Sequence, residues 1–214
     1  MCLHKSKPVT IHCIESFLIL VAKTSMSTKY KFKDQDKLYF ISFAVVYWID
    51  LFIRNEYKDI LLDSWKYCQA NKGMKLYAWC IMTSHVHLII GSHRDKLENI
   101  MRDMKRHTSG TLKNAIRNHP AESRKEWMLW LMERAGKKNN NNSDFQLWRQ
   151  DNHPIALATP CIAHQKLKYL HYNPVEAGFV EKPEDYLYSS AIDYYTNKKG
   201  LIEIERMDAI LRSR

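Results

Sequence analysis

The chain has 214 residues, which is enough to bury the core of one domain and short for two. Lys and Arg number 33 against 23 Asp and Glu, and the net charge of +10 favours a polyanionic partner, nucleic acid before an anionic membrane surface, over an acidic or neutral one. The 5 cysteines are odd in number and include no C-x-x-C pair, which argues against a disulfide framework or a cysteine zinc site and favours a reducing, intracellular compartment.

We expect residues 1–25 to be an extension outside the folded core. Their apolar run, "FLILVA" (Phe17 to Ala22), lacks the small-residue cleavage site of a secretory signal. No run in the sequence approaches the roughly 20 apolar residues of a membrane span. Met26 opens a polar stretch that leads directly into the first strand pattern, so we predict one domain over residues 26–197 and a C-terminal tail over 198–214.

The first half of this domain has strand and helix patterns in turn. The aromatic and β-branched run "LYFISFAVVYW", from Leu38, predicts a strand. Apolar residues then recur near the helical period in "NEYKDILLDSWKYCQANKG", with Asn55 as the expected N-cap and Gly73 as the stop. Two short apolar runs follow, "MKLYAWCIM" and "HVHLIIG", and the polar step Thr83-Ser84 between them predicts a hairpin.

A long helical pattern follows the hairpin. It extends from Leu97 to Asn118, and Pro120 closes it. The segment 121–135 is compatible with another helix, and "GKKNNNNSD" (residues 136–144) has the composition of a loop.

After the loop we expect a short strand over Phe145–Arg149 and a helix in "PCIAHQKLKYLHYNPV" that ends at Pro174. The order strand, helix, strand, strand, helix, strand matches the split βαβ plan of ferredoxin-like and RRM-like domains. We therefore predict an α+β fold, in which an antiparallel sheet has helices on one face and a C-terminal helix carries a tyrosine. The opposite face of the sheet would be open for chemistry.

The second strand of the hairpin carries two histidines one residue apart, in "MTSHVHLII". Alternate residues of a strand share a face, so His85 and His87 would lie together on the open side while Val86 and Leu88 face the helices. Two imidazoles at this spacing can bind one metal ion, although a third ligand must come from elsewhere. For an isolated pair, half-buried histidines bonded to nearby carbonyls are the commoner outcome. A histidine-triad nucleotide hydrolase needs a third histidine at Ile89, and its absence argues against that class.

The predicted C-terminal helix presents a polar stripe of Lys166, Tyr169 and Asn173 at i, i+3 and i+7, beside an apolar stripe that docks the helix. Asn173 would hold its amide oxygen near the Tyr169 hydroxyl, where it could complete a metal site. Taken alone, Tyr169 is more simply explained as one packing aromatic among 12 tyrosines.

Together, "MTSHVHLII" and the later "YLHYNPVEAGFV" resemble the single-tyrosine HUH transposases (transposase IS200-like), in particular the REP-associated tyrosine transposase branch. The resemblance extends from about Leu38 to Tyr195 and takes in "WRQDNHPI" and "DYLYSSAIDYY". It departs at the hairpin turn, where the family commonly has Pro-Asn and this chain has Thr83-Ser84. Residues 1–25 and the loop 136–144 have no counterpart in the family core.

The resemblance implies a role for each residue of the two motifs. Tyr169 would be the nucleophile, His85 and His87 would bind a divalent metal, and Asn173 matches the position of the third ligand. Mg²⁺ or Mn²⁺ is expected from the family alone, because imidazole ligands by themselves suit zinc, manganese, nickel or copper better than magnesium.

The implied activity is metal-dependent cleavage of single-stranded DNA and strand transfer through a 5′-phosphotyrosine intermediate, as in DNA transposition or the mobilisation of repeat elements. Single-stranded or hairpin DNA is the implied partner, dimerisation occurs in the wider family, and a cytoplasmic, nucleoid-associated location is expected. The alternative is a nucleic-acid-binding module on the same split βαβ plan that forms no covalent bond. Simple binding does not require His85, His87 and Tyr169 together, which distinguishes the two hypotheses.

Basic residues on the helix Leu97–Asn118 favour a DNA partner. Several fall within one arc opposite the apolar residues of that helix, although a solvated charged face is the usual explanation for such a pattern. With the lysine beside the tyrosine included, the predicted DNA-binding residues are Arg102, Lys105, Arg106, Lys113, Arg117 and Lys166.

Overall fold

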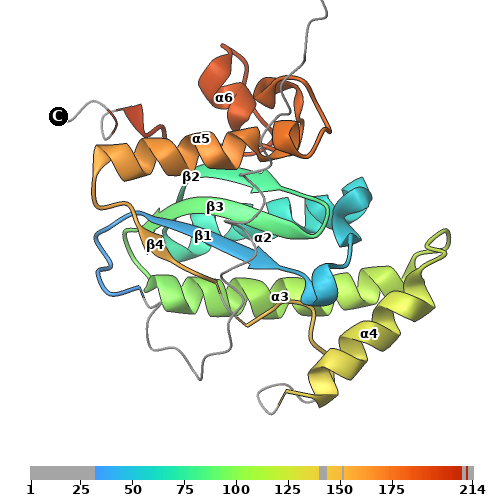
Figure 1. Cartoon of the computed structure of the whole chain (residues 1–214). Helices are drawn as coiled ribbons and strands as arrows, with labels where there is room; N and C mark the ends of the chain where they lie inside the picture. Colours follow the sequence, from blue (N-terminus) through green and yellow to red (C-terminus); the bar gives the residue numbers. More distant parts are fainter. Residues whose placement is uncertain (1–31, 140–143, 151, 209–210, 212–214) are drawn as a thin grey trace, which may run out of the picture.

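The computed structural model describes residues 32–139, 144–150, 152–208 and 211, so the predicted extension 1–25 lies outside the described residues. The strands form one antiparallel sheet in the order β2-β3-β1-β4 (Figure 1). They are β1 (Tyr39–Ala44), β2 (Met74–Ile81), β3 (His85–Ser92) and β4 (Ile155–Ala156). Because β1 lies between β3 and β4, the strand order is that of the split βαβ plan, and the predicted α+β class is confirmed.

Helices cover both faces of this sheet (Figure 1). On one face, α2 (Asn55–Lys72) and α3 (Leu97–Asn118) share a core with the side chains of Val86 and Leu88. On the other face lies α5 (Pro160–Glu176). The two helices of the split βαβ plan thus lie on one face, as predicted, whereas the face of the histidines, which was expected to be open, is covered by the tyrosine-bearing helix α5.

The apolar stripe of α5 explains this covering. Ala163, Leu167 and Leu170 recur at helical spacing and are buried, together with Phe40 and Ile89 of the sheet, in a second core on the α5 side. Burying a leucine side chain contributes about 1.5 to 3 kcal/mol, so this stripe has a sufficient driving force to hold α5 on the sheet.

The remaining elements connect or flank these layers. They are η1 (Val46–Trp48), η2 (Leu51–Ile53), α4 (Lys125–Lys137), η3 (Pro183–Asp185) and α6 (Ala191–Tyr195). Within the described residues, no helix combines the length and apolar character needed to cross a membrane.

The first strand is shorter than its sequence predicts. β1 ends at Ala44, whereas the aromatic pattern continues to Trp48. Beyond it, Val45 N donates to Ser84 O at 2.9 Å and Val46 N donates to Leu147 O at 2.8 Å. These two hydrogen bonds replace the regular pairing of β1 with its neighbouring strands, and the chain turns away from the sheet.

The predicted strand Phe145–Arg149 is wrong, because the fourth strand is β4, ten residues later along the chain, where Phe40 pairs with Ile155. The earlier segment makes a single bridge, between Trp148 and Val45. Its apolar character has another cause: Leu147 and Trp148 are buried in the core, and Trp148 Nε1 donates to Thr108 Oγ1 at 3.0 Å. The apolar pattern of this segment is therefore explained by the burial of its side chains in the core beyond the end of β1, and not by strand pairing.

Two helix ends also differ by a residue or two from prediction. Asn55 is the first residue of α2, not its N-cap, and its side chain accepts a hydrogen bond from Lys58 Nζ. Gly73 does end α2, with a positive φ of 72° that suits glycine. α5 continues through Pro174 to Glu176, since a proline in the last turn removes only one helical hydrogen bond.

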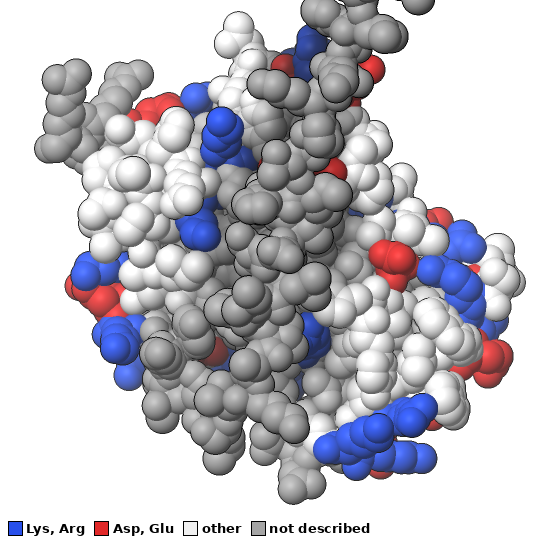
Figure 2. All heavy atoms as spheres, in the orientation of Figure 1, with Lys and Arg blue, Asp and Glu red and all other residues white. Residues whose placement is uncertain are grey.

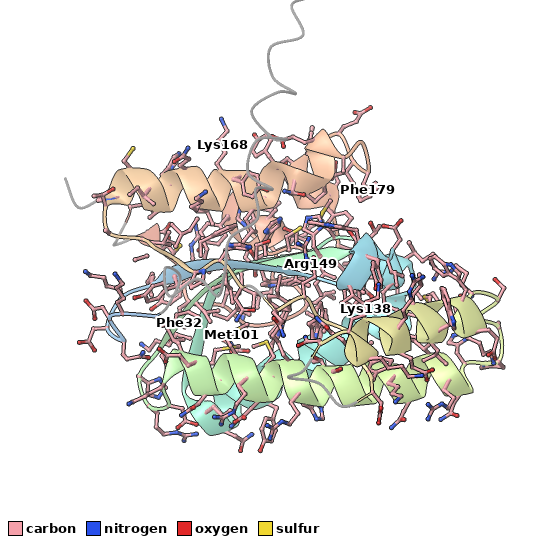
Figure 3. The ribbon with its side chains drawn as sticks, turned by 60° about the horizontal axis from the view of Figure 1, so that its bottom comes forward. Phe32, Met101, Lys138, Arg149, Lys168 and Phe179 are labelled. Carbon is pink, nitrogen blue, oxygen red and sulfur yellow. The ribbon has the colours of Figure 1, made fainter. Side chains whose placement is uncertain are left out.

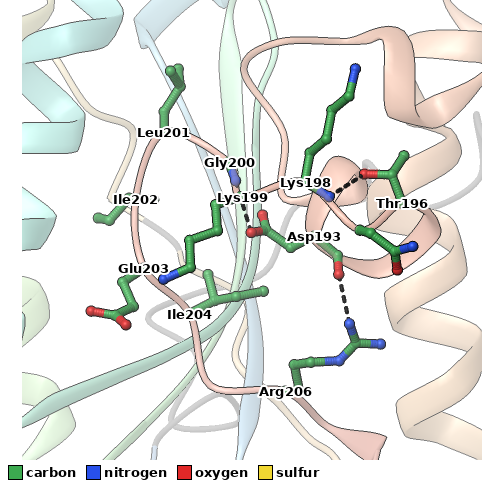
Figure 4. Close-up of a pocket in the computed structure, with 11 residues that line it drawn as sticks. Asp193, Thr196, Lys198, Lys199, Gly200, Leu201, Ile202, Glu203, Ile204 and Arg206 are labelled. Atoms are coloured by element: carbon green, nitrogen blue, oxygen red, sulfur yellow. Dashed lines mark hydrogen bonds between the residues drawn. The ribbon is translucent and has the colours of Figure 1, made fainter.

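The chain after α6 packs along the outer edge of the sheet. Glu205 N donates to Leu76 O of β2 at 2.8 Å, and the side chains of Ile202 and Met207 are buried. A pocket of about 520 Å³ opens within this segment, lined by residues between Asp193 and Arg206 (Figure 4). Asp193 closes the loop, because its Oδ1 accepts from Gly200 N at 2.9 Å and its carbonyl accepts from Arg206 Nη1 at 2.8 Å.

A buried carboxylate links the start of α2 to the connection between α3 and α4. Glu122, in the connection between α3 and α4, accepts hydrogen bonds from Arg54 Nε at 2.9 Å, from Arg124 Nε at 3.0 Å and from Tyr57 Oη at 3.4 Å. Burial alone would raise the pKa of Glu122, but the hydrogen bonds from Arg124 and Arg54 lower it to about 2.

Glu122→Gln should therefore lower the free energy of unfolding at pH 7 by about 2 kcal/mol, since it replaces hydrogen bonds between charged groups with weaker ones. The folded-state pKa lies below the ordinary value of 4.5, so the stabilisation is complete above that pH and is lost as the pH falls towards 2. Urea unfolding of both proteins between pH 7 and pH 2.5 measures the difference. A gap that stays constant over this range would contradict the assigned role of the carboxylate.

Candidate active site

The two histidines occupy the first and third positions of β3. His85 pairs with Ala44 and His87 with Ser42 of β1, so both rings project from the same face, as the alternation predicts. Their ring centroids are 4.8 Å apart, with the planes at 77°. His87 is 3% exposed, whereas His85 is half-buried and lies nearer the end of the sheet.

Tyr169 and Asn173 of α5 lie directly against this pair. The Tyr169 ring centroid is 5.3 Å from that of His87, and Asn173 Nδ2 is 3.4 Å from His87 Nε2. Phe40 of β1 packs on both aromatic groups, stacked on His87 at 5.5 Å and edge-on to Tyr169 at 5.9 Å. The four residues predicted for chemistry therefore converge within one chain.

A hydrogen-bond network with β2, at the edge of the sheet, holds α5 in this position. His171 Nε2 is 2.9 Å from Ser190 Oγ, which also accepts from Trp79 N of β2 at 2.9 Å. Ser190 N in turn donates to Trp79 O at 2.9 Å. His171 is fully buried, and burial lowers its pKa to about 3, so it acts as a neutral link between helix and sheet.

Burial also sets the protonation of the site. It lowers the pKa of His87 to about 3, with smaller contributions from His85 and Lys166, and it lowers the pKa of His85 as well. Burial raises the pKa of Tyr169, and the Asn173 side chain offsets part of this change. At neutral pH both imidazoles are uncharged and able to bind a metal, and the phenol is protonated.

The donor set fits a divalent metal if the amide completes it. The Asn173 side chain interacts with both histidines, and a half-turn of the amide presents its oxygen in place of its nitrogen. His87 Nδ1 is buried without a hydrogen-bond partner, so no second-shell contact fixes its tautomer in the described structure. No group of three His, Cys, Asp or Glu residues suited to a metal occurs in the described part of the chain, so the third protein ligand here would be Asn173.

The hairpin turn that departs from the family pattern supports His85. Ser84 Oγ lies 3.3 Å from His85 Nδ1, so this contact occupies one ring nitrogen and leaves Nε2 as the candidate metal-binding atom. Thr83 Oγ1 donates to Asp50 Oδ1 at 2.6 Å, and Phe52 N donates to Thr83 O at 2.8 Å. The Thr83-Ser84 turn is thus anchored and orients one of the predicted ligands.

Lys166 is the only predicted DNA-binding residue that lies on the face of the histidines. Its Nζ is 5.2 Å from the Phe40 ring centroid and 5.6 Å from that of Tyr169. A positive charge is therefore held over the Tyr169 ring.

The other five predicted residues lie on α3, which packs on the opposite face of the sheet (Figure 1). Three of them have partners within the protein. Lys105 Nζ donates to Arg149 O at 2.8 Å, Arg102 pairs with Asp103 at 3.0 Å, and Lys113 stacks on Phe145 at 4.6 Å. Arg106 and Arg117 are exposed.

Three residues at the site were not foreseen. Phe40 packs between His87 and Tyr169, the Trp48 ring centroid is 5.5 Å from that of His85, and Arg149 lies over Trp48 at 5.5 Å. Alternation along β1 would have placed Phe40 on one face, but only the pairing of Ser42 with His87 shows which neighbours it meets.

Comparison with known families decides the broad class. The model of the family described as "Transposase IS200 like" matches residues 39–132, from β1 into α4, including both histidines. These residues belong to the IS200-like transposase family. The family resemblance is thereby confirmed over the range that holds the histidine motif, and it supports an enzyme of the transposase type, associated with DNA transposition. Tyr169 and Asn173 follow the matched range. No curated protein sequence matches the chain.

Two solved structures are similar to this chain. One is a REP-associated tyrosine transposase bound to a REP hairpin, with a TM-score of 0.57 and 13% identity; the match covers 88% of this chain and 99% of that one. The other is a provisionally assigned transposase from Deinococcus radiodurans R1, with a TM-score of 0.39 and 17% identity, over 67% of this chain and 93% of that one. The first likeness establishes a shared fold.

Ser190→Ala should lower the free energy of unfolding by about 2 kcal/mol, because it leaves the buried His171 Nε2 and Trp79 N without their partner. Urea unfolding measures this change. Ser109→Ala on α3, a half-buried serine, is the matched control, with an expected change within about 0.5 kcal/mol. Equal effects of the two substitutions would exclude Ser190 as the residue that fixes α5.

Proposed function

We propose that this transposase cleaves and rejoins single-stranded DNA through a covalent 5′-phosphotyrosine at Tyr169. The observation that carries the proposal is the position of Asn173, whose amide lies 3.4 Å from His87 Nε2 and one helical turn from Tyr169. A nucleophile and three metal-binding side chains then meet at one point, which the histidine pair alone does not provide.

Tyr169 supplies the covalent chemistry. Its phenolic oxygen forms a bond to the scissile phosphorus and gives up its proton, while the bond from phosphorus to the 3′ oxygen breaks and that oxygen leaves as a 3′-hydroxyl. The energy of the phosphodiester is kept in the phosphotyrosine. Attack by another 3′-hydroxyl reverses the exchange, releases Tyr169 and joins the strands without a nucleotide cofactor.

The residues that would hold a divalent metal, Mg²⁺ or Mn²⁺, are His85, His87 and Asn173. A bound metal would withdraw charge from the scissile phosphate. The burial that keeps both imidazoles neutral makes them available as ligands at neutral pH. Lys166 adds a second positive charge beside the Tyr169 ring, where it can attract the phosphate before attack.

Single-stranded or hairpin DNA is the proposed substrate, as expected of the REP-associated branch. The support is the chain's net charge of +10, together with the shared fold of a protein bound to a REP hairpin. A homodimer and a cytoplasmic location on the nucleoid are compatible with this role. A binding module without chemistry would not require Tyr169 and Asn173 beside the histidine pair.

Incubation with end-labelled hairpin DNA and Mn²⁺, followed by a denaturing gel, should give a covalent protein–DNA adduct. Tyr169→Phe abolishes it, because phenylalanine has no nucleophilic oxygen, and so does EDTA. Tyr172→Phe, three residues along the same helix, is the matched control and retains it. An adduct that persists in Tyr169→Phe would rule out this nucleophile, and absence of any adduct across REP-type hairpins and metals would refute the proposed chemistry.

A further inference from the structure

Two consecutive aromatic residues shortly after the end of β1 have an unusual conformation. Tyr47 and Trp48 both have a φ of 55°, in the left-handed region that large side chains rarely adopt. The two residues are 50% and 54% exposed, so burial in the core does not compensate for the strained backbone. Strain of this kind collects at functional sites, where the surrounding structure maintains it.

The Trp48 ring lies beside the candidate active site. Its centroid is 5.5 Å from that of His85, with the two planes at 75°, and the Arg149 guanidinium lies over the ring at 5.5 Å from its centroid. The Trp48 ring, with the Arg149 cation over it, therefore forms an aromatic surface directly beside His85.

A groove of about 420 Å³ continues from this surface. Tyr47 and Trp48 form one wall, and the polar lining comes from Lys138, Asn139, Gln146 and Arg149. Arg149 and Lys138 lie between the end of β1 and α4 (Figure 3). Basic side chains gather over α4 at the lower right of the space-filling view (Figure 2).

A second groove adjoins this one and reaches the basic residues of α3. The second groove, of about 620 Å³, shares Gln146 and Arg149 with the first and is lined on its far side by Arg102, Lys105 and Arg106. None of the described residues that line either groove is acidic. A positively charged path therefore leads from His85, around the end of β1, to the opposite face of the sheet.

We infer that this path binds the single strand next to the scissile phosphate, with a base stacked on Trp48 and phosphates on Arg149 and Lys138. The inference rests on the proposed function and names the part of the protein that positions its substrate. Stacking on an aromatic ring accepts any base, and cations along a groove follow the backbone, which together suit single-stranded nucleic acid better than duplex. The path also links the basic residues of α3 to a site on the other face of the sheet.

Binding can be measured apart from cleavage in a Tyr169→Phe background. Fluorescence anisotropy with a labelled oligonucleotide that extends on both sides of the hairpin should show about a 5- to 100-fold loss of affinity for Trp48→Ala, the range expected of one lost stacking contact. Trp48→Phe should recover most of the loss. Arg149→Ala should weaken binding and reduce its salt dependence by about one phosphate contact.

Trp130→Ala is the matched control. Trp130 is 55% exposed and has Arg134 over its ring at 5.4 Å, yet it lies on α4 outside both grooves, so its loss should leave affinity unchanged. Unchanged affinity in Trp48→Ala and Arg149→Ala, or an equal loss for duplex DNA, would overturn the inference. Because these variants lack Tyr169, a Trp48-dependent affinity without any adduct in the parent protein would refute the chemistry and leave the binding path intact.

Discussion

The candidate site depends on one packing contact, that of α5 across the histidine face of the sheet. Leu167 and Leu170 are buried there, at about 1.5 to 3 kcal/mol each, whereas the 3.4 Å contact of Asn173 with His87 is at most a weak hydrogen bond. Apolar burial therefore holds the helix on the sheet, and the polar contact and the network around Ser190 determine which residues meet. Without α5, His85 and His87 would be two histidines on an open sheet.

The same contact determines the chemistry that the site can support. Covering the sheet removes water from His87 and from the Tyr169 hydroxyl, which keeps the imidazoles neutral and the phenol protonated until substrate and metal arrive. Beside His85, beyond the end of β1, the strained residues Tyr47 and Trp48 are exposed. One face of the sheet thus serves folding through α2 and α3, and the other serves the site.

The sequence predicted those parts of the protein that follow from local periodicity. Alternation placed His85 and His87 on one face, helical spacing aligned Tyr169 with Asn173, and the element order identified the split βαβ plan. What failed depended on contacts between distant segments. The apolar pattern of Phe145–Arg149 reflects the burial of Leu147 and Trp148 in the core. β1 ends at Ala44 because the next two backbone amides donate hydrogen bonds to Ser84 and Leu147. Nothing in the spacing of Trp48 or Phe40 indicates that either ring would lie against a histidine.

The central claim is that Tyr169 serves the histidine pair of its own chain, and mixing two inactive variants tests it most directly. His87→Ala keeps the nucleophile but lacks a metal-binding residue, and Tyr169→Phe keeps the metal-binding residues but lacks the nucleophile. With a site assembled inside each chain, a mixture should form no more adduct on labelled hairpin DNA than either variant alone, under conditions in which the parent protein reacts. Adduct on the His87→Ala chains of the mixture would contradict the account and show that α5 completes the site of a neighbouring chain.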